Sequence, residues 1–151
     1  MTEYLLEARN VVKTYDEGRI EALRGVDLAV RAGEFIAITG PSGSGKSTLL
    51  QLLGGLDRPT TGEIRHRGRS FANSFDMDSY RAEHVGFVFQ AFHLLPTLTA
   101  LENVQIPMFE SRLTTRERVE KARTLLRDMG LEHRLTQHPN KLSAGERQRV
   151  A

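Results

Sequence analysis

The chain changes its hydrophobic pattern once along its length. Before residue 90, short apolar runs rich in β-favouring residues alternate with turn residues, which is typical of strands. Beyond residue 90, apolar residues recur at helical spacing, as at Val119, Ala122 and Leu126. We therefore expect an α/β part over residues 1–90 and a helical part over residues 91–151.

Several apolar runs in the first part predict strands. Residues 34–39 and residues 85–89 are continuous apolar stretches of the kind that form buried strands. Residues 4–10 alternate imperfectly and predict another strand. Residues 20–30 contain Gly25, which predicts two strands on either side of a break.

The strongest chemical signal is residues 40–47, which fit G-x-x-x-x-G-K-[ST] at every required position. An expected strand precedes them, and a helix that ends at Gly54 and Gly55 is expected to follow. Glycines bring backbone N–H groups against an anion, and the helix N-terminus adds partial positive charge. Lys46 would reach the β- and γ-phosphates, and the Ser47 hydroxyl would hold Mg²⁺. The motif predicts a nucleoside triphosphate site.

Composition limits the remaining possibilities. The 151 residues include 21 basic and 19 acidic residues, so the net charge of +2 does not indicate a nucleic-acid partner. The basic cluster at residues 65–69 has no interleaved aromatic residue and predicts a solvated hairpin. The absence of cysteine excludes disulfides and thiol chemistry. No apolar run reaches the roughly 18 to 20 residues that span a bilayer, and residues 1–4 lack the basic-then-apolar layout of a secretory signal. We expect a soluble protein that reaches a membrane only from its surface.

Other polar residues mark helix starts and a possible base contact. Thr99 and Thr114 are expected helix caps, and Ser143 with Glu146 forms a further capping box. The start of that last helix, with Ser143 and Gly145, fits a second anion site and equally an ordinary capped helix. Tyr15 precedes a turn, where it would either stack on a nucleotide base or pack on its own hairpin.

Three separately spaced motifs together resemble the ATP-binding subunit of ABC transporters. They are residues 40–48, Gln90 and the LSAGE sequence at residues 142–146, and the chain is similar to the lipoprotein-release and macrolide-export type over essentially its whole length. The resemblance implies an α/β fold: a P-loop NTPase core with a flanking antiparallel β subdomain, plus an α-helical subdomain that carries the signature motif. It implies ATP and Mg²⁺ as ligands.

The resemblance also implies roles for individual residues. Tyr15 would stack on adenine, Lys46 and Gln90 would act in catalysis, and Ser47 and Gln90 would contact Mg²⁺. Ser143 and Gly145 would close on the γ-phosphate bound by a second ATP-binding subunit, in a head-to-tail dimer. The implied nucleotide-binding residues are Tyr15, Gly40, Pro41, Ser42, Gly43, Ser44, Gly45, Lys46, Ser47, Thr48, Ser143 and Gly145.

A membrane partner is implied as well. The apolar segment from Phe92 to Leu98 matches the groove that receives a coupling helix of a transmembrane permease, although ordinary subdomain core is the alternative. The subunit would lie in the cytoplasm, on the inner face of the cell membrane, and would couple ATP binding and hydrolysis to export or lipoprotein release. A non-transport, ATP-gated interaction module of the same fold is the alternative function.

The sequence departs from the family pattern in two ways. Ala144 stands where the usual signature has glycine, which puts one methyl group beside the expected anion site. No apolar run ending in aspartate forms a Walker B strand, so we expect the Mg²⁺-binding Asp and the catalytic Glu in a missing C-terminal third of the domain. This one incomplete domain is expected to hydrolyse ATP poorly or not at all. A GTPase is not indicated. GTPases recognise the guanine base with an Asn-Lys-x-Asp motif, and the nearest match, residues 140–143, has Ser143 in place of the aspartate.

Overall fold

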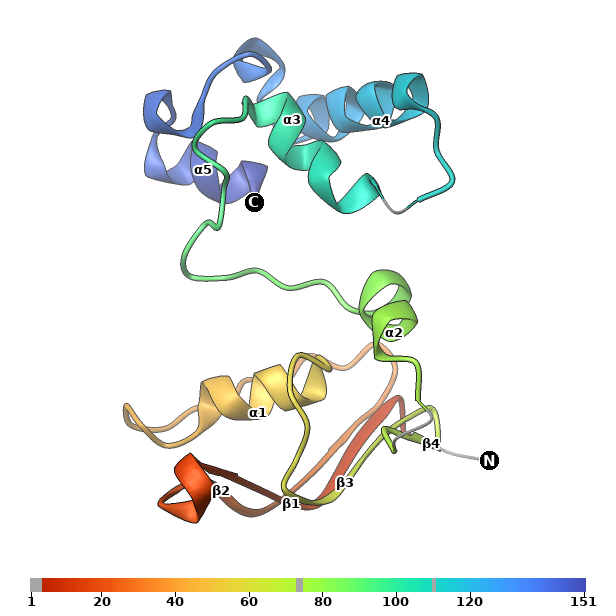
Figure 1. The fold of residues 1–151 in the computed structure, drawn as a ribbon, viewed down its shortest axis with the longest axis vertical. Helices are drawn as coiled ribbons and strands as arrows, with labels where there is room; N and C mark the ends of the chain where they lie inside the picture. Colours follow the sequence, from red (N-terminus) through yellow and green to blue (C-terminus); the bar gives the residue numbers. More distant parts are fainter. Residues whose placement is uncertain (1–3, 73–74, 110) are drawn as a thin grey trace. The chain divides into compact units, whose positions relative to one another are not determined.

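The computed structural model describes residues 4–72, 75–109 and 111–151. It divides into two compact units, Met1–Phe87 and Val88–Ala151. Figure 1 shows the strands in the first unit and the longest helix in the second. The division falls close to residue 90, where the hydrophobic pattern changes.

The first unit is built on a four-stranded antiparallel sheet. Its strands are β1 (Leu6–Tyr15), β2 (Ile20–Val30), β3 (Thr61–His66) and β4 (Arg69–Ser70), in the order β2-β1-β3-β4. A 3-10 turn, η1 (Asp16–Gly18), joins the first two strands. The predicted basic hairpin is the β3–β4 pair, whose two connecting residues, Arg67 and Gly68, both have positive φ, as a tight hairpin turn requires.

The expected break at Gly25 is a bulge inside one strand. Residues 20–30 form β2 without interruption, and its register with β1 shifts near Val11. Gly25 has φ of 76°, and a Cβ atom there would lie 2.7 Å from Asn10 Oδ1. Asn10 itself has φ of 46° and donates its N–H to Asp27 Oδ1 at 2.8 Å. The prediction of two strands was wrong because the sheet absorbs the extra residues as a local twist.

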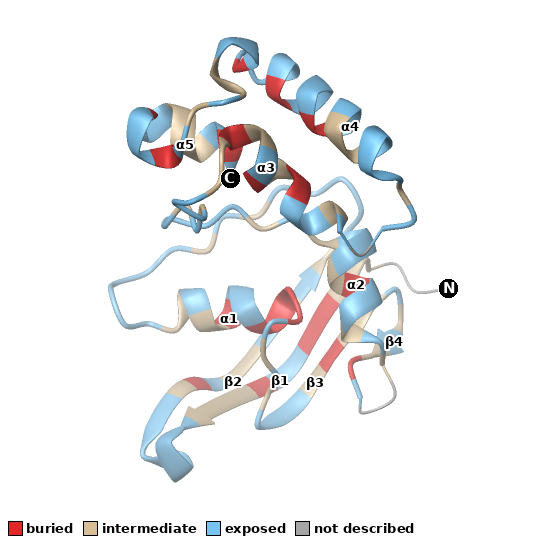
Figure 2. Cartoon of the chain, turned by 45° about the horizontal axis from the view of Figure 1, so that its top comes forward, coloured by how far each residue is buried: buried red, intermediate tan, exposed pale blue. Residues whose placement is uncertain are grey.

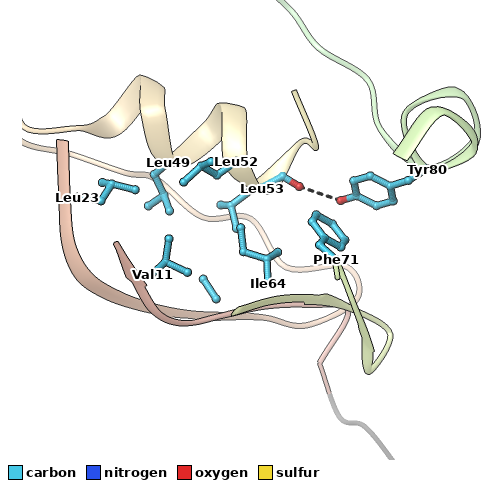
Figure 3. Packing of buried hydrophobic residues seen from close by; sticks show 9 residues of the cluster. Val11, Leu23, Leu49, Leu52, Leu53, Ile64, Phe71 and Tyr80 are labelled. Carbon is cyan, nitrogen blue, oxygen red and sulfur yellow. Dashed lines mark hydrogen bonds between the residues drawn. The ribbon is translucent and has the colours of Figure 1, made fainter. Parts of the chain in front are cut away.

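The core of this unit lies between the sheet and helix α1 (Lys46–Leu53). Leu49, Leu52 and Leu53 of α1 pack against Val11 and Ile64 of the sheet, as Figure 3 shows. Helix α2 (Met77–His84) completes the core with Tyr80, whose hydroxyl donates to the carbonyl of Leu53 at 2.9 Å. The predicted helix after the glycine motif is confirmed, with Gly54 as its C-cap.

Two expected strands are not strands in the structure. Residues 34–39 and residues 85–89 form neither helix nor strand and belong to no ladder of the four-stranded sheet. Phe35 is 93% exposed and Val88 is 86% exposed, so neither run is buried as expected. An apolar run becomes a strand only when a neighbouring backbone pairs with it, and the sheet of the described residues offers none to either run.

The second unit is helical. It contains α3 (Ala100–Gln105), α4 (Thr115–Asp128) and α5 (Ala144–Val150), with 3-10 turns η2 (Ile106–Met108), η3 (Glu132–Arg134) and η4 (Pro139–Lys141). Thr99, Thr114 and Ser143 cap the three α-helices through capping boxes, which confirms these helix starts. Figure 2 shows short buried stretches on the helices of this unit. Its apolar core cluster consists of Ala100, Leu126, Leu131, Leu142 and Val150. No described helix is both long and apolar enough to cross a membrane.

Candidate nucleotide-binding site

The glycine motif leads into α1 with a backbone that only glycine fits. Gly45 is the N-cap of α1 and has φ of 85°, in the left-handed region. A Cβ atom on Gly45 would collide with the carbonyl of Ala22 and with Leu23 of β2. The glycine lets the loop pass close against β2 and turn directly into the helix.

The start of α1 differs from the starts of the other α-helices. In the described chain, the four other α-helices each begin with a side chain that accepts hydrogen bonds from first-turn N–H groups; these caps are Asp76, Thr99, Thr114 and Ser143. Helix α1 begins with Gly45, which has no side chain to offer. Its first-turn N–H groups therefore point to an acceptor from outside the chain, and the helix dipole favours an anion there.

Lys46 brings a positive charge to the same place. Its Nζ donates to the carbonyl of Pro41 at 2.6 Å, to the carbonyl of Gly40 at 3.0 Å and to Ser44 Oγ at 3.4 Å. The ammonium group therefore lies over the loop, within reach of phosphate oxygens that would replace these acceptors. Ser47 is exposed in the first turn of α1, where its hydroxyl is available to a metal ion held by the phosphates. The residues fit both a polyphosphate and Mg²⁺.

Tyr15 lies beside the start of α1. Its hydroxyl donates to Asp57 Oδ2 at 3.0 Å, and the Thr48 side chain is a second hydrogen-bond partner. Desolvation and the bond to Asp57 raise the pKa of Tyr15. The residue is 37% exposed. The ring is therefore tied to α1 and the loop that follows it, rather than only to its own hairpin.

Gln90 and the apolar segment lie in the second unit. Gln90 is exposed, and in the segment 92–98 Leu94 packs against the helical core while Leu95 is 46% exposed. Asn103 of α3 fixes this segment: its Oδ1 accepts from the Leu95 N–H at 2.8 Å, and its Nδ2 donates to the carbonyls of Leu95, Leu98 and Thr99. The segment is an anchored turn with an exposed apolar side.

The signature residues form the start of α5. Ser143 Oγ accepts from the Glu146 N–H at 3.2 Å, and Glu146 Oε2 accepts from the Ser143 N–H at 2.7 Å. Glu146 also accepts from Arg134 Nε at 2.8 Å. The bonds from the Ser143 backbone and from Arg134 lower the pKa of Glu146 to about 2. Ala144 and Gly145 are exposed. The capped-helix interpretation holds, and the γ-phosphate role of Ser143 and Gly145 stays a prediction.

The structure brings part of the predicted site together. Tyr15, Thr48 and residues 40–47 belong to the first unit and lie around the start of α1. Gln90, Ser143 and Gly145 belong to the second unit. Sequence reasoning missed Lys13, Asp57 and Asn103. Asn103 could have been found, because it is a polar residue one helical turn after the buried Ala100. Lys13 and Asp57 carry no local signal, since 44 residues separate them.

A glycine loop that runs into a helix without a capping side chain, with a lysine over the loop, defines a P-loop nucleotide-binding site. The comparisons with known proteins agree. A family model described as ABC transporter matches residues 23–151. The chain therefore belongs to the ABC transporter family, and it corresponds to the ATP-binding part.

Individual relatives cover nearly the whole chain. The lipoprotein-releasing system ATP-binding protein LolD of Psychrobacter arcticus is 50% identical over 97% of this chain and 67% of that protein. The macrolide export ATP-binding/permease protein MacB of Pasteurella multocida is 46% identical over all of this chain and 24% of that protein. The dimeric ATP-binding cassette MJ0796, bound to ADP and Pi, superposes with a TM-score of 0.83 at 42% identity, over 96% of this chain and 66% of that one. The predicted fold class is confirmed, and the chain spans about two thirds of the cassettes it matches.

Proposed function

We propose that the chain binds Mg²⁺-ATP at the start of α1 and acts as the ATP-binding subunit of an export or lipoprotein-release transporter. The observation that carries this proposal is the glycine-capped helix with Lys46 over its loop. Tyr15 provides the base contact, and Ser47, with Gln90, contacts Mg²⁺. The relatives named for lipoprotein release and macrolide export favour a transport subunit over a non-transport regulator.

The partners follow from the same proposal. Ser143 and Gly145 of one copy close on the γ-phosphate held by a second copy, in a head-to-tail dimer, and a dimeric cassette superposes well on this chain. The segment 92–98, held by Asn103 with Leu95 exposed, receives a permease segment at the inner face of the membrane. An apolar contact of this kind requires a turn that keeps its shape, which Asn103 provides.

Hydrolysis requires more than the P-loop provides. Phosphoryl transfer depends on Mg²⁺ and on a carboxylate that orients the attacking water. The glycine motif at residues 40–47 contains no carboxylate. The family is one of ATPases. For the 151-residue chain we expect ATP binding with little or no turnover.

A turnover assay with three proteins tests this part. Phosphate release is measured for the unchanged chain, for Lys46→Ala and for Lys121→Ala, whose lysine is exposed on α4 and serves as the control. We expect no turnover above background in any of them. Turnover that Lys46→Ala abolishes and Lys121→Ala retains would show that a carboxylate within the chain completes the site.

A further inference from the structure

We propose that Asp57 and Lys13 are positioning residues that hold the Tyr15 ring as a platform for the nucleotide base. The inference rests on the proposed ATP site and specifies how its base-binding side is built. It starts from a group of side chains that lies outside the glycine motif, and that joins the end of β1 to the loop after α1.

Asp57 uses both of its carboxylate oxygens. Oδ1 accepts from Lys13 Nζ at 2.8 Å and from the Arg58 N–H at 2.7 Å, while Oδ2 accepts from the Tyr15 hydroxyl at 3.0 Å. Partial burial alone would raise the pKa of Asp57, but the bond from Lys13, with those from Arg58 and Tyr15, brings it below the ordinary value. The carboxylate is therefore charged at neutral pH and bonds the tyrosine and the lysine at once.

Lys13 lies against the tyrosine ring as well as against Asp57. Its Nζ is 4.8 Å from the ring centroid, its side chain is only 12% exposed, and it also donates to the carbonyl of Arg58 at 2.8 Å. A cation held over one face of the ring leaves a flat ligand the other face for stacking. With 37% of Tyr15 exposed, a base has access to the ring.

The hydroxyl fixes the direction of the ring. Its bonds to Asp57 and to the Thr48 side chain tie Tyr15 to both ends of the α1 region, so the ring is held relative to the phosphate loop. Phenol rings otherwise rotate among staggered side-chain positions, and stacking requires one of them. A ring that is already held in the stacking position loses less conformational entropy when the nucleotide binds.

Comparing the affinities for Mg²⁺-ATP and Mg²⁺-tripolyphosphate distinguishes the loss of a base contact from a general effect on folding. Both ligands use the phosphate loop, but only ATP has a base. Affinities of both are measured by calorimetry for the unchanged chain, Asp57→Asn, Lys13→Met, Tyr15→Phe and Tyr15→Ala. Asp128→Asn is the matched control, because Asp128 is exposed on α4. Asp57→Asn removes the negative charge that Lys13 pairs with and replaces one carboxylate oxygen by an NH₂ group, so one of the two acceptors used by Lys13 and Tyr15 is lost.

We expect Tyr15→Ala to weaken ATP binding by about 5- to 150-fold. Asp57→Asn and Lys13→Met should weaken it by about two- to tenfold, with tripolyphosphate affinity unchanged. The double variant Tyr15→Phe/Asp57→Asn should lose less ATP affinity than the two single losses added together, because both changes affect the bond between Tyr15 and Asp57.

Different failures have different meanings. If Tyr15→Ala weakens the binding of ATP but not of tripolyphosphate, while Asp57→Asn and Lys13→Met leave both affinities unchanged, Tyr15 contacts the base but the positioning role of Asp57 and Lys13 is overturned. If either positioning variant weakens both ligands equally, its effect is structural and the proposal is also overturned. If the unchanged chain binds tripolyphosphate and ATP equally, no base platform exists; if it binds neither, the ATP site itself is wrong.

Discussion

Asn103 bonds both backbone groups of Leu95: the Leu95 N–H donates to Oδ1 at 2.8 Å, and the Leu95 carbonyl accepts from Nδ2 at 3.2 Å. The same amide also donates to Leu98 and Thr99. One side chain therefore holds the apolar turn before α3 in a single shape, with Asn103 only 8% exposed.

Replacing Asn103 by alanine should destabilise the chain by about 1–3 kcal/mol, because several partly buried backbone groups lose their partner. Urea denaturation measures the change. Asn140→Ala is the control, since Asn140 is exposed. Equal denaturation midpoints for the two variants would contradict the anchoring role.

The bonds to Glu146 predict a pH dependence. Its pKa is about 2 in the folded chain, against 4.5 for an ordinary glutamate. A depressed carboxylate pKa stabilises the folded state at pH above the ordinary value, and that stabilisation is lost as pH falls from about 4.5 towards 2. Glu146→Gln should therefore be less stable than the unchanged chain at neutral pH.

Denaturation at a series of pH values measures this effect. The stability difference between the unchanged chain and Glu146→Gln should shrink steadily as the pH approaches 2. Glu120→Gln, with its glutamate exposed on α4, is the control and should show no such convergence. A difference that stays constant down to pH 2 would show that the bonds of Glu146 do not favour its charged form.

Gly54 and Phe87 make a contact that leaves no room for a side chain. A Cβ atom on Gly54 would collide with the Phe87 ring. Gly54→Ala should destabilise the chain by about 1–3 kcal/mol through overpacking. Shortening the partner in Gly54→Ala/Phe87→Leu should cost less than the two single changes added together. Additive losses in thermal melts would mean that the ring does not limit position 54.

The sequence predicted what depends on near neighbours. The caps at Thr114 and Ser143 are confirmed, because a capping side chain and the N–H groups it accepts from lie within three residues of each other. The helix after the glycine motif is confirmed as well. The candidate phosphate site could also be predicted from the sequence, because the glycine motif consists of consecutive residues.

What depends on distant partners was not predictable. Residues 34–39 have a strand composition, but strand formation requires pairing, and Phe35 lies exposed. The contact of Lys13 and Tyr15 with Asp57 crosses more than 40 residues, with no motif at either end. The bulge at Gly25 likewise required Asn10 on the neighbouring strand.

The most direct test of the central claim is a calorimetric titration of the unchanged chain and Lys46→Ala with Mg²⁺-ATP. Lys46 provides a charged donor at the start of α1, so its removal should weaken ATP binding by about 10- to 100-fold, while Lys121→Ala binds as the unchanged chain does. Equal affinities for Lys46→Ala and the unchanged chain would contradict a phosphate site at this helix.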